Sequence, residues 1–324
     1  MTAIHSATPL REIDVTDKDS SPAHDRSTAP ASPAALGGMD GSAAARAPSA
    51  FANVRTVAGR ELRDALRSRW FLLDTLAFLG LGLAVSFVSS ASAGGLGLAG
   101  FGRTTAGLLN LILLVVPLMS LTAGAGTIAS ERERGMLPYL LAQPLARWEL
   151  LLGKYLGLLV AMIGCLAMGL GGCAAVMAWR SGTTDPWSLV HLVLLSMMLT
   201  AAMLGLGVLV SVIARRASVA VGVSVFLWLL LVFVTDLGLM AGTLAFKLRI
   251  ETLFVLAVAN PLQVFKLWSL SSLDASLDVL GPAGLYALDT LGAGLPWLFA
   301  SVLAAWVILP LGAALVVFSR RSPT

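Results

Sequence analysis

The sequence predicts an all-α integral membrane protein with six transmembrane helices. The first observation is a set of six apolar runs, each long enough to cross the roughly 30 Å hydrocarbon core, which takes about 20 helical residues. The second is a low content of charge, and the third is an uneven placement of Lys and Arg. The runs cover about residues 70–93, 106–129, 155–178, 187–213, 217–241 and 294–318.

Composition excludes an ordinary soluble domain. Hydrophobic residues make up 57% of the 324-residue chain, charged residues 12%, and the mean hydropathy is +0.86. A soluble domain carries about 25% charged residues. Backbone groups in lipid must be hydrogen-bonded within the protein, so each apolar run is expected to be a helix. The net charge of +4 follows membrane topology and does not indicate nucleic-acid binding.

The basic residues orient the predicted spans. With the N-terminus inside, thirteen Lys and Arg fall in cytoplasmic segments and five outside, a positive-inside bias. Six spans return the C-terminus to the cytoplasm, so both termini are expected there. The inside set is Arg55, Arg60, Arg63, Arg67, Arg69, Arg132, Arg134, Arg147, Lys154, Arg215, Arg216, Arg320 and Arg321; the outside set is Arg103, Arg180, Lys247, Arg249 and Lys266.

The region before the first span divides in two. Residues 1–50 are rich in Ala, Ser, Pro, Thr and Asp without apolar periodicity, which predicts a disordered cytoplasmic tail. Residues 54–70 place apolar side chains at helical spacing, with Arg60, Arg63 and Arg67 on another face. This pattern predicts an amphipathic elbow helix along the cytoplasmic membrane surface, and a plain basic flank of the first span is the alternative. Residues 51–324 form the predicted six-helix domain.

Two glycine motifs do not indicate nucleotide binding. Gly95, Gly97 and Gly100 form a literal G-x-G-x-x-G, but in a predicted external turn and not in a βαβ unit. Gly153-Lys154 is followed by Tyr155, so the phosphate-binding loop of an ATPase is absent from the sequence. We therefore expect a non-catalytic chain.

Soft metal ligands occur on two predicted spans without forming one tight cluster. Cu(I) favours thiol, thioether and imidazole ligands, but Met and free Cys are also common packing residues. We predict no metal site. These side chains are Cys165, Cys173, Met162, Met168, Met177, His191, Met197, Met198 and Met203.

Two carboxylates and one glycine pair lie within predicted spans. Asp74 and Asp236 are candidates for a substrate path, because ionisable groups in a membrane are costly. Gly153 and Gly157 form G-x-x-x-G, which favours close helix packing.

The connection from about 130 to 154 is the most informative segment. A span runs into mixed charges, turns at Gly135, continues as a short apolar helix over 137–142, turns at Pro144 and re-enters the membrane. Apolar residues at 137–142 are unusual for a loop. A compact element anchored at both ends can transmit force from a cytoplasmic partner.

This segment resembles that of the ABC-2 class of ABC transporter permeases. The shared pattern is E-x-E-x-G, an apolar stretch, P-x-x-R and L-x-G-K, with departures at Met136 and Pro138. The resemblance implies a coupling helix that docks on an ABC ATPase subunit, which binds the ATP and magnesium; this chain itself would bind no cofactor. The implied coupling residues are Glu131, Arg132, Glu133, Arg134, Gly135, Pro144 and Arg147.

Residues 60–70 and the stretch after Asn260-Pro261 are similar to the NosY family of membrane subunits. That family belongs to the transporter that helps mature the copper enzyme nitrous oxide reductase. The resemblance implies a homodimer in the inner membrane, contacts with lipid, and cargo related to sulfur or copper. It also implies a periplasmic partner on the long outer connection, 242–293, where one or two interfacial helices are expected. The candidate partner surface is Asn260, Pro261, Phe265 and Lys266.

Two other functions stay open. One is export of a drug, lipid or polysaccharide by an ABC-2 transporter. The other is a membrane scaffold that transports nothing, which predicts no ATPase partner.

Overall fold

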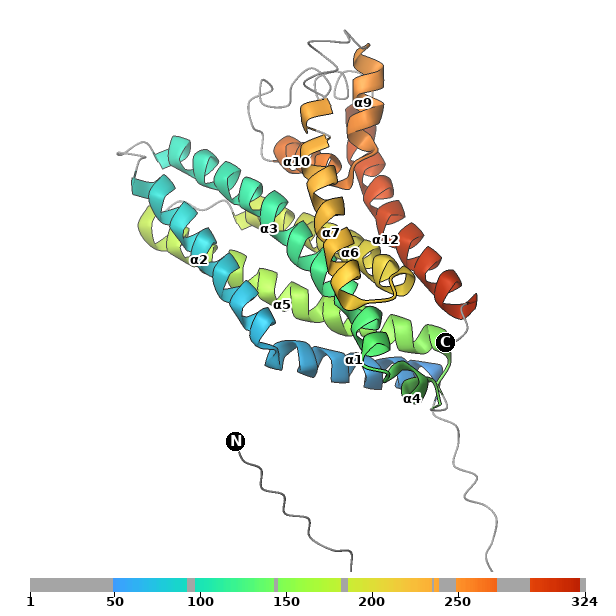
Figure 1. Cartoon of the computed structure of the whole chain (residues 1–324). Helices are drawn as coiled ribbons and strands as arrows, with labels where there is room; N and C mark the ends of the chain where they lie inside the picture. Colours follow the sequence, from blue (N-terminus) through green and yellow to red (C-terminus); the bar gives the residue numbers. More distant parts are fainter. Residues whose placement is uncertain are drawn as a thin grey trace, which may run out of the picture. The chain divides into compact units, whose positions relative to one another are not determined.

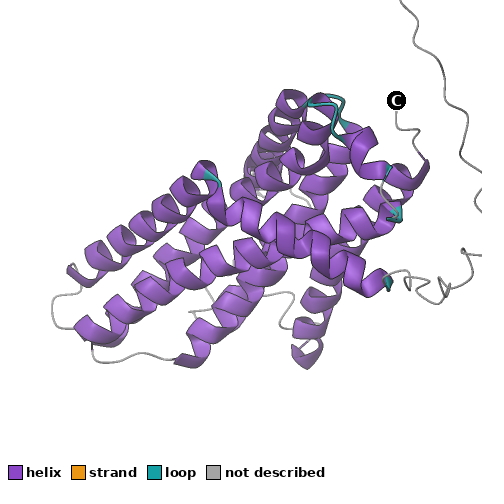
Figure 2. Ribbon diagram, turned by 90° about the horizontal axis from the view of Figure 1, so that it is seen from below, coloured by secondary structure: helices purple, strands orange, loops and turns teal. Residues whose placement is uncertain are grey.

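A computed structural model describes residues 49–91, 97–142, 145–181, 186–234, 236–238, 249–272 and 292–320. Within these ranges the chain is helical, with short turns and no strand (Figure 2). The predicted tail lies almost wholly outside the described residues. The long helices are α1 Ala50–Arg67, α2 Arg69–Ala91, α3 Gly97–Glu133, α5 Arg147–Ser181, α6 Pro186–Ile213, α7 Ala217–Leu229 and α12 Leu295–Arg320. The shorter elements are α4 Leu137–Leu141, the π-helix η2 Leu230–Val234, α9 Ile250–Val258, α10 Pro261–Ser272 and the 3-10 turn η4 Gly292–Gly294.

Five described helices are long and apolar enough to cross a membrane. They correspond to the second to sixth predicted runs, in α3, α5, α6, α7 with its continuation, and α12 (Figure 1). The first predicted run, in α2, passes the same criterion only together with α1, from which it bends by 65°. A second bent pair, α9 and α10, turns by 105°, so the structure allows five to seven spans. The multi-pass membrane fold is therefore confirmed, while the number six stays a prediction.

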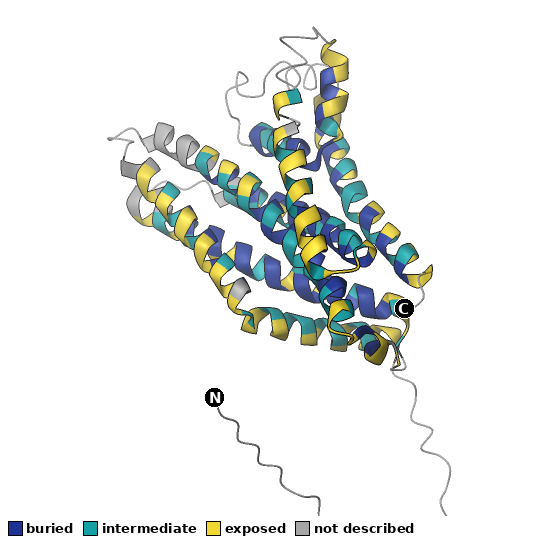
Figure 3. Cartoon of the chain, in the orientation of Figure 1, coloured by how far each residue is buried: buried dark blue, intermediate teal, exposed yellow. Residues whose placement is uncertain are grey.

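The centre of the bundle is the crossing of α3 and α6. Side chains added at Gly124 on α3 or Gly207 on α6 would collide with the backbone of the other helix; a Gly124 Cβ would lie 2.7 Å from the Leu204 carbonyl oxygen. Small residues let membrane helices approach this closely. Buried residues concentrate along α5 and α6, while exposed residues cover the outer faces of α2 and α7 (Figure 3).

Helix α1 packs along the first turns of α5. A Cβ at Gly153 would lie 2.7 Å from the Val57 side chain, and one at Gly157 would collide with the Ala58 carbonyl. The expectation of close packing at this G-x-x-x-G is therefore confirmed, and the helix that fills it is α1. In Figure 1, α1 runs across one end of the bundle, close to α4. We call this the connector end, because it contains the segment 130–154 that links α3 to α5.

One sequence-based expectation was wrong. Gly97 and Gly100 lie in the first turns of α3 and not in a turn, because a glycine costs a helix only about 1 kcal/mol while membrane backbone must stay hydrogen-bonded. The outer connection contains two short helices, α9 and α10, as expected, and eight of the twelve residues of α10 are buried. Helix α10 packs against α6 and α12 inside the bundle. A position of these helices at the membrane interface stays a prediction.

Candidate coupling site

We define the connector as residues 130–154, which link α3 to α5. Helix α3 ends in a Schellman motif: the Met136 N–H donates to the Glu131 carbonyl (2.9 Å) and the Gly135 N–H to the Arg132 carbonyl (3.1 Å). Gly135 has φ +69°, a left-handed conformation that favours glycine. The glycine of the predicted motif therefore sets where the chain leaves α3.

The five-residue helix α4 has one buried and one exposed side. Leu137 and Leu140 are buried in a cluster with residues of α3, α5, α6 and α12. Pro138 stands in the first turn, where its missing N–H costs nothing. On the other side Met136 is 45% exposed and Tyr139 is 74% exposed. The element is thus anchored by two leucines and presents an apolar and aromatic face outward.

A buried charge triad joins the connector to α1. The Lys154 ammonium lies 2.7 Å from Glu131 Oε1 and 2.8 Å from Glu61 Oε2. Only 7% of the Lys154 side chain is exposed, and 21% of each glutamate. A lysine removed from water in this way needs nearby carboxylates to remain charged. The triad ties α1, α3 and α5 together at one point.

Arg132 and Glu133 hold the turn between α6 and α7. The Arg132 guanidinium donates to the carbonyls of Val212 (3.3 Å) and Ala214, at the end of α6. Glu133 Oε2 accepts from the first N–H of α7, that of Ala217 (2.9 Å). The positive charge of Arg132 thus lies at the C-terminal end of α6 and the negative charge of Glu133 at the N-terminal end of α7, and each complements the dipole of that helix.

Two further contacts reach α12 and α1. The Arg147 guanidinium donates to the Ser319 carbonyl, near the last residue of α12 (3.0 Å). Glu149 Oε2 accepts from the N–H of Ala146, which precedes α5 (3.1 Å), and from Asn53 Nδ2 of α1 (2.9 Å). The hydrogen bond from the Ala146 N–H to Glu149 is half of a capping box at the start of α5.

The structure therefore brings most predicted coupling residues into one set of helix-end contacts. Arg134 is exposed beside them, and Pro144 lies outside the described residues. Sequence reasoning did not assign roles to Glu61, Asn53 and Glu149. A lysine at the start of an apolar run signals that a carboxylate must lie nearby, but Glu61 is 93 residues away and only the fold identifies it.

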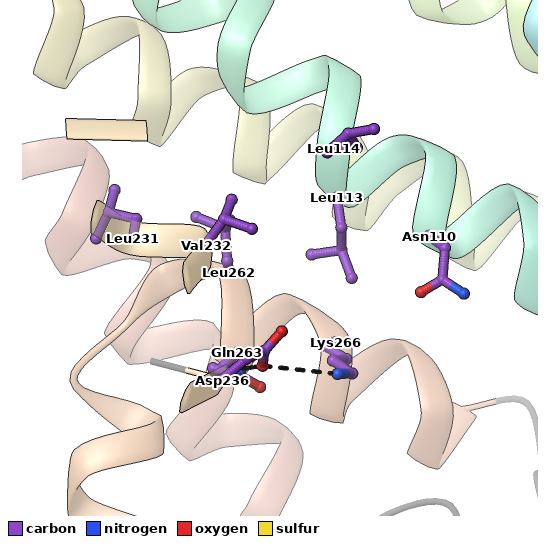
Figure 4. Close-up of a pocket in the computed structure, with 9 residues that line it drawn as sticks. All are labelled: Asn110, Leu113, Leu114, Leu231, Val232, Asp236, Leu262, Gln263 and Lys266. Carbon is purple, nitrogen blue, oxygen red and sulfur yellow. Dashed lines mark hydrogen bonds and ion pairs between the residues drawn. The ribbon is translucent and has the colours of Figure 1, made fainter. Parts of the chain in front are cut away.

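The end of the bundle opposite the connector contains another set of polar side chains, around the start of α10. Asn260 caps α10, accepting from the Leu262 N–H (2.9 Å), and donates to the Leu231 carbonyl (2.6 Å). Gln263 Nε2 donates to Asp236, whose carboxylate lies 3.9 Å from Lys266 Nζ (Figure 4). The side chains of Asp236, Gln263 and Lys266 line a 150 Å³ cavity with Asn110 and several aliphatic residues. Asp236 thus has partners that the sequence did not indicate.

Three of the four residues predicted to face a periplasmic partner are buried. Asn260, Pro261 and Phe265 pack within the chain, and Lys266 is partly exposed. Their side chains therefore do not offer a surface in this chain, because α10 enters the bundle. A periplasmic partner at this end stays a prediction.

The described residues contain no group of three or more His, Cys, Asp and Glu that could hold a metal ion. Cys165 and Cys173 are both free and buried. The His191 ring lies by Trp187, with ring centroids 5.8 Å apart.

Comparison with known proteins gives one consistent picture. The model of the "ABC-2 family transporter protein" family matches residues 55–322. A "probable ABC transporter permease protein NosY" from Stutzerimonas stutzeri is 30% identical over 274 residues, which cover 83% of this chain and 98% of that protein. The protein of the same description from Pseudomonas aeruginosa is 31% identical over 276 residues, with the same coverage.

Proposed function

Because the chain belongs to the ABC-2 family of transporter permeases, we propose that its connector couples ATP hydrolysis on a separate ATPase subunit to rearrangement of its helices. Permeases of this family work with an ATPase subunit, on which the ATP and magnesium would be bound. The observation that carries the proposal is the bonding of the connector to α1, α6, α7 and α12. A displacement of α4 would therefore be transmitted through the connector to all four helices.

The surface that the ATPase subunit would contact is the exposed side of α4. Met136, Pro138 and Tyr139 are held outward by the buried Leu137 and Leu140. An exposed aromatic anchor surrounded by apolar surface is the usual centre of a protein interface. In this scheme the connector end is cytoplasmic, the chain lies in the inner membrane, and two copies pair above two ATPase subunits. ATP-bound and ATP-free partners would each favour a different packing of the bundle.

We propose cargo related to sulfur or copper, used in maturation of nitrous oxide reductase. The support is the similarity to the two NosY proteins, which covers nearly their whole length. Deleting this chain from cells that make a copper enzyme of that kind, and measuring its metal content, tests the cargo separately from the coupling.

The coupling is tested by changing Tyr139→Glu, with Phe51→Glu as the matched control. Both side chains are more than 70% exposed and both belong to the connector end, but Phe51 lies on α1 and not on α4. We expect Tyr139→Glu to abolish co-purification of the ATPase subunit and transport-linked ATP hydrolysis, while Phe51→Glu retains both. Equal ATPase binding by the two variants, both correctly inserted, would contradict the proposed docking face.

A further inference from the structure

Two cavities meet between α2, α3 and α5. The larger, of 690 Å³, opens at the connector end and is lined by four carboxylates, those of Glu61, Asp64, Asp74 and Glu131, against the cationic Lys154 and Arg134. We call it the vestibule. The smaller, of 10 Å³, lies deeper and is lined by Met119, Met162, Cys165 and Ser120 together with Phe78 and other residues. Met162 lines both cavities.

We propose that Met119, Met162 and Cys165 bind one soft monovalent metal ion, Cu(I) or its analogue Ag(I), in the smaller cavity. Thioether and thiolate sulfur are the ligands that select Cu(I) over harder cations. Met162 and Cys165 stand three residues apart on one face of α5, and Met119 reaches the cavity from α3. Exposed fractions are 8% for Met119 and 3% for each of the other two. The pattern was not evident from the sequence, because Met119 joins the pair only through folding.

The size and charge of the cavity fit such an ion. A volume of 10 Å³ corresponds to about one water-sized sphere, which leaves room for one bare ion and not for a hydrated one. On binding, a sulfur–metal bond replaces the S–H bond of Cys165 and the proton leaves to water. The metal–thiolate unit is neutral, which avoids most of the cost of burying an isolated charge in a membrane protein.

The Ser120 hydroxyl is an unpaired polar group beside the cavity. Ser120 is fully buried, and its oxygen finds no hydrogen-bond partner within the described residues. Neighbouring helical hydroxyls behave differently: Ser196 donates to the Leu192 carbonyl (2.6 Å) and Thr200 to the Ser196 carbonyl (2.7 Å). Unpaired buried polar atoms are rare and costly.

The vestibule supplies a route to the site. Lys154 is paired with two of its carboxylates, Glu61 and Glu131, and Arg60 lies 3.8 Å from a third, that of Asp64. Among the described residues, Asp74 is the carboxylate of the vestibule that forms no ion pair. The Glu131 Oε2 atom is buried there without a partner among the described residues. A cation drawn into this cavity meets the Met162 side chain at the wall shared with the sulfur-lined cavity.

The alternative is that these sulfur atoms only pack the core. The test is an anaerobic titration of the purified full chain in lipid nanodiscs with Cu(I), against a chromophoric Cu(I) chelator, repeated with Ag(I). We expect one tightly bound ion per chain. We expect a loss of affinity of at least about tenfold in Met162→Leu, Met119→Leu and Cys165→Ser. X-ray absorption should show sulfur neighbours only at the metal.

Matched controls separate ligand loss from a general effect. Met168→Leu removes an exposed thioether from the same helix, and Cys173→Ser removes a buried thiol from it. Both should bind Cu(I) as the unchanged chain does. Met162→Leu conserves volume, so it should fold normally. Equal affinity of Met162→Leu and the unchanged chain, or an equal loss in Cys173→Ser, would overturn the proposal. The result does not depend on the coupling scheme, because the ATPase subunit is absent from the titration.

Discussion

The two ends of the bundle each contain a short helix, yet the two helices are packed differently. At the connector end, α4 buries two leucines and exposes the rest of its described surface. At the opposite end, α10 buries eight of its twelve residues between α6 and α12. The first is a surface held in place, and the second is part of the core.

The polar contacts explain the difference. At the connector end, Arg132, Glu133 and Arg147 are bonded to the ends of other helices. At the other end, the amides of Asn260 and Gln263 are hydrogen-bonded to the Leu262 N–H and to Asp236, which allows α10 to be buried. The comparison teaches that the exposed helix α4 is held in place by charged side chains bonded to helix ends, whereas the buried helix α10 is held by side-chain amides. The predictions below test whether the connector end is the more strongly coupled of the two.

The largest effect is expected from Lys154→Met. Removing the ammonium leaves Glu61 and Glu131 close together and mostly buried, which should lower the free energy of unfolding by about 3 kcal/mol. Thermal unfolding in detergent measures the change. Adding Glu61→Gln and Glu131→Gln to the same chain should recover most of the loss, because no unpaired charge remains. No recovery in the triple variant would show that the effect is not electrostatic.

An intermediate effect is expected from Gly124→Ala at the centre of the bundle. The added methyl would meet the backbone of α6, so we expect a loss of about 1–3 kcal/mol. Gly126→Ala, two residues along the same helix, has open space around the new methyl and should be neutral or slightly stabilising. The same thermal unfolding measurement compares the pair, and equal losses would be inconsistent with the close crossing of α3 and α6.

A smaller effect is expected from Glu133→Gln. The amide oxygen can still accept from the Ala217 N–H, but the charge that favours the start of α7 is lost, at a cost of about 0.5 kcal/mol. Hydrogen exchange of the first turn of α7 should increase while the middle of α6 is unchanged. Faster exchange throughout α6 would mean that Glu133 supports more than this helix end.

The smallest effect is expected at the opposite end, from Lys266→Met. Its ammonium lies 3.9 Å from Asp236, and both side chains are more than a third exposed, so solvent screens the pair. The change in unfolding free energy should stay below about 1 kcal/mol. A loss as large as that of Lys154→Met would erase the distinction between the two ends.

Much of the fold could be predicted from the sequence. Length and hydropathy located five of the spans, because membrane helices need long apolar runs. The bounds were less certain: α5 begins at Arg147 and not near 155, since Glu149 caps a helix start that precedes the apolar run. The burial of α10 could not be predicted, because its polar residues are satisfied by distant groups such as Asp236.

For the candidate coupling site, the sequence predicted which segment of the chain forms it but not which residues that segment contacts. Glu131 to Arg147 were singled out by their pattern, but the partners of these residues lie far along the chain, such as Ala217 for Glu133 and Ser319 for Arg147. A single sequence carries no signal for such pairs. Likewise, Met119 and Cys165 line one cavity only because α3 packs beside α5.

The central claim is that an ATPase subunit docks on α4 at the connector end. The most direct measurement places a photo-crosslinking amino acid at Tyr139, or at Trp297 as the comparison, in the complex purified from cells. Both positions are highly exposed, and they mark opposite ends of the bundle. The account predicts a crosslink to the ATPase subunit from position 139 and none from position 297. A crosslink to that subunit from position 297 alone would contradict it.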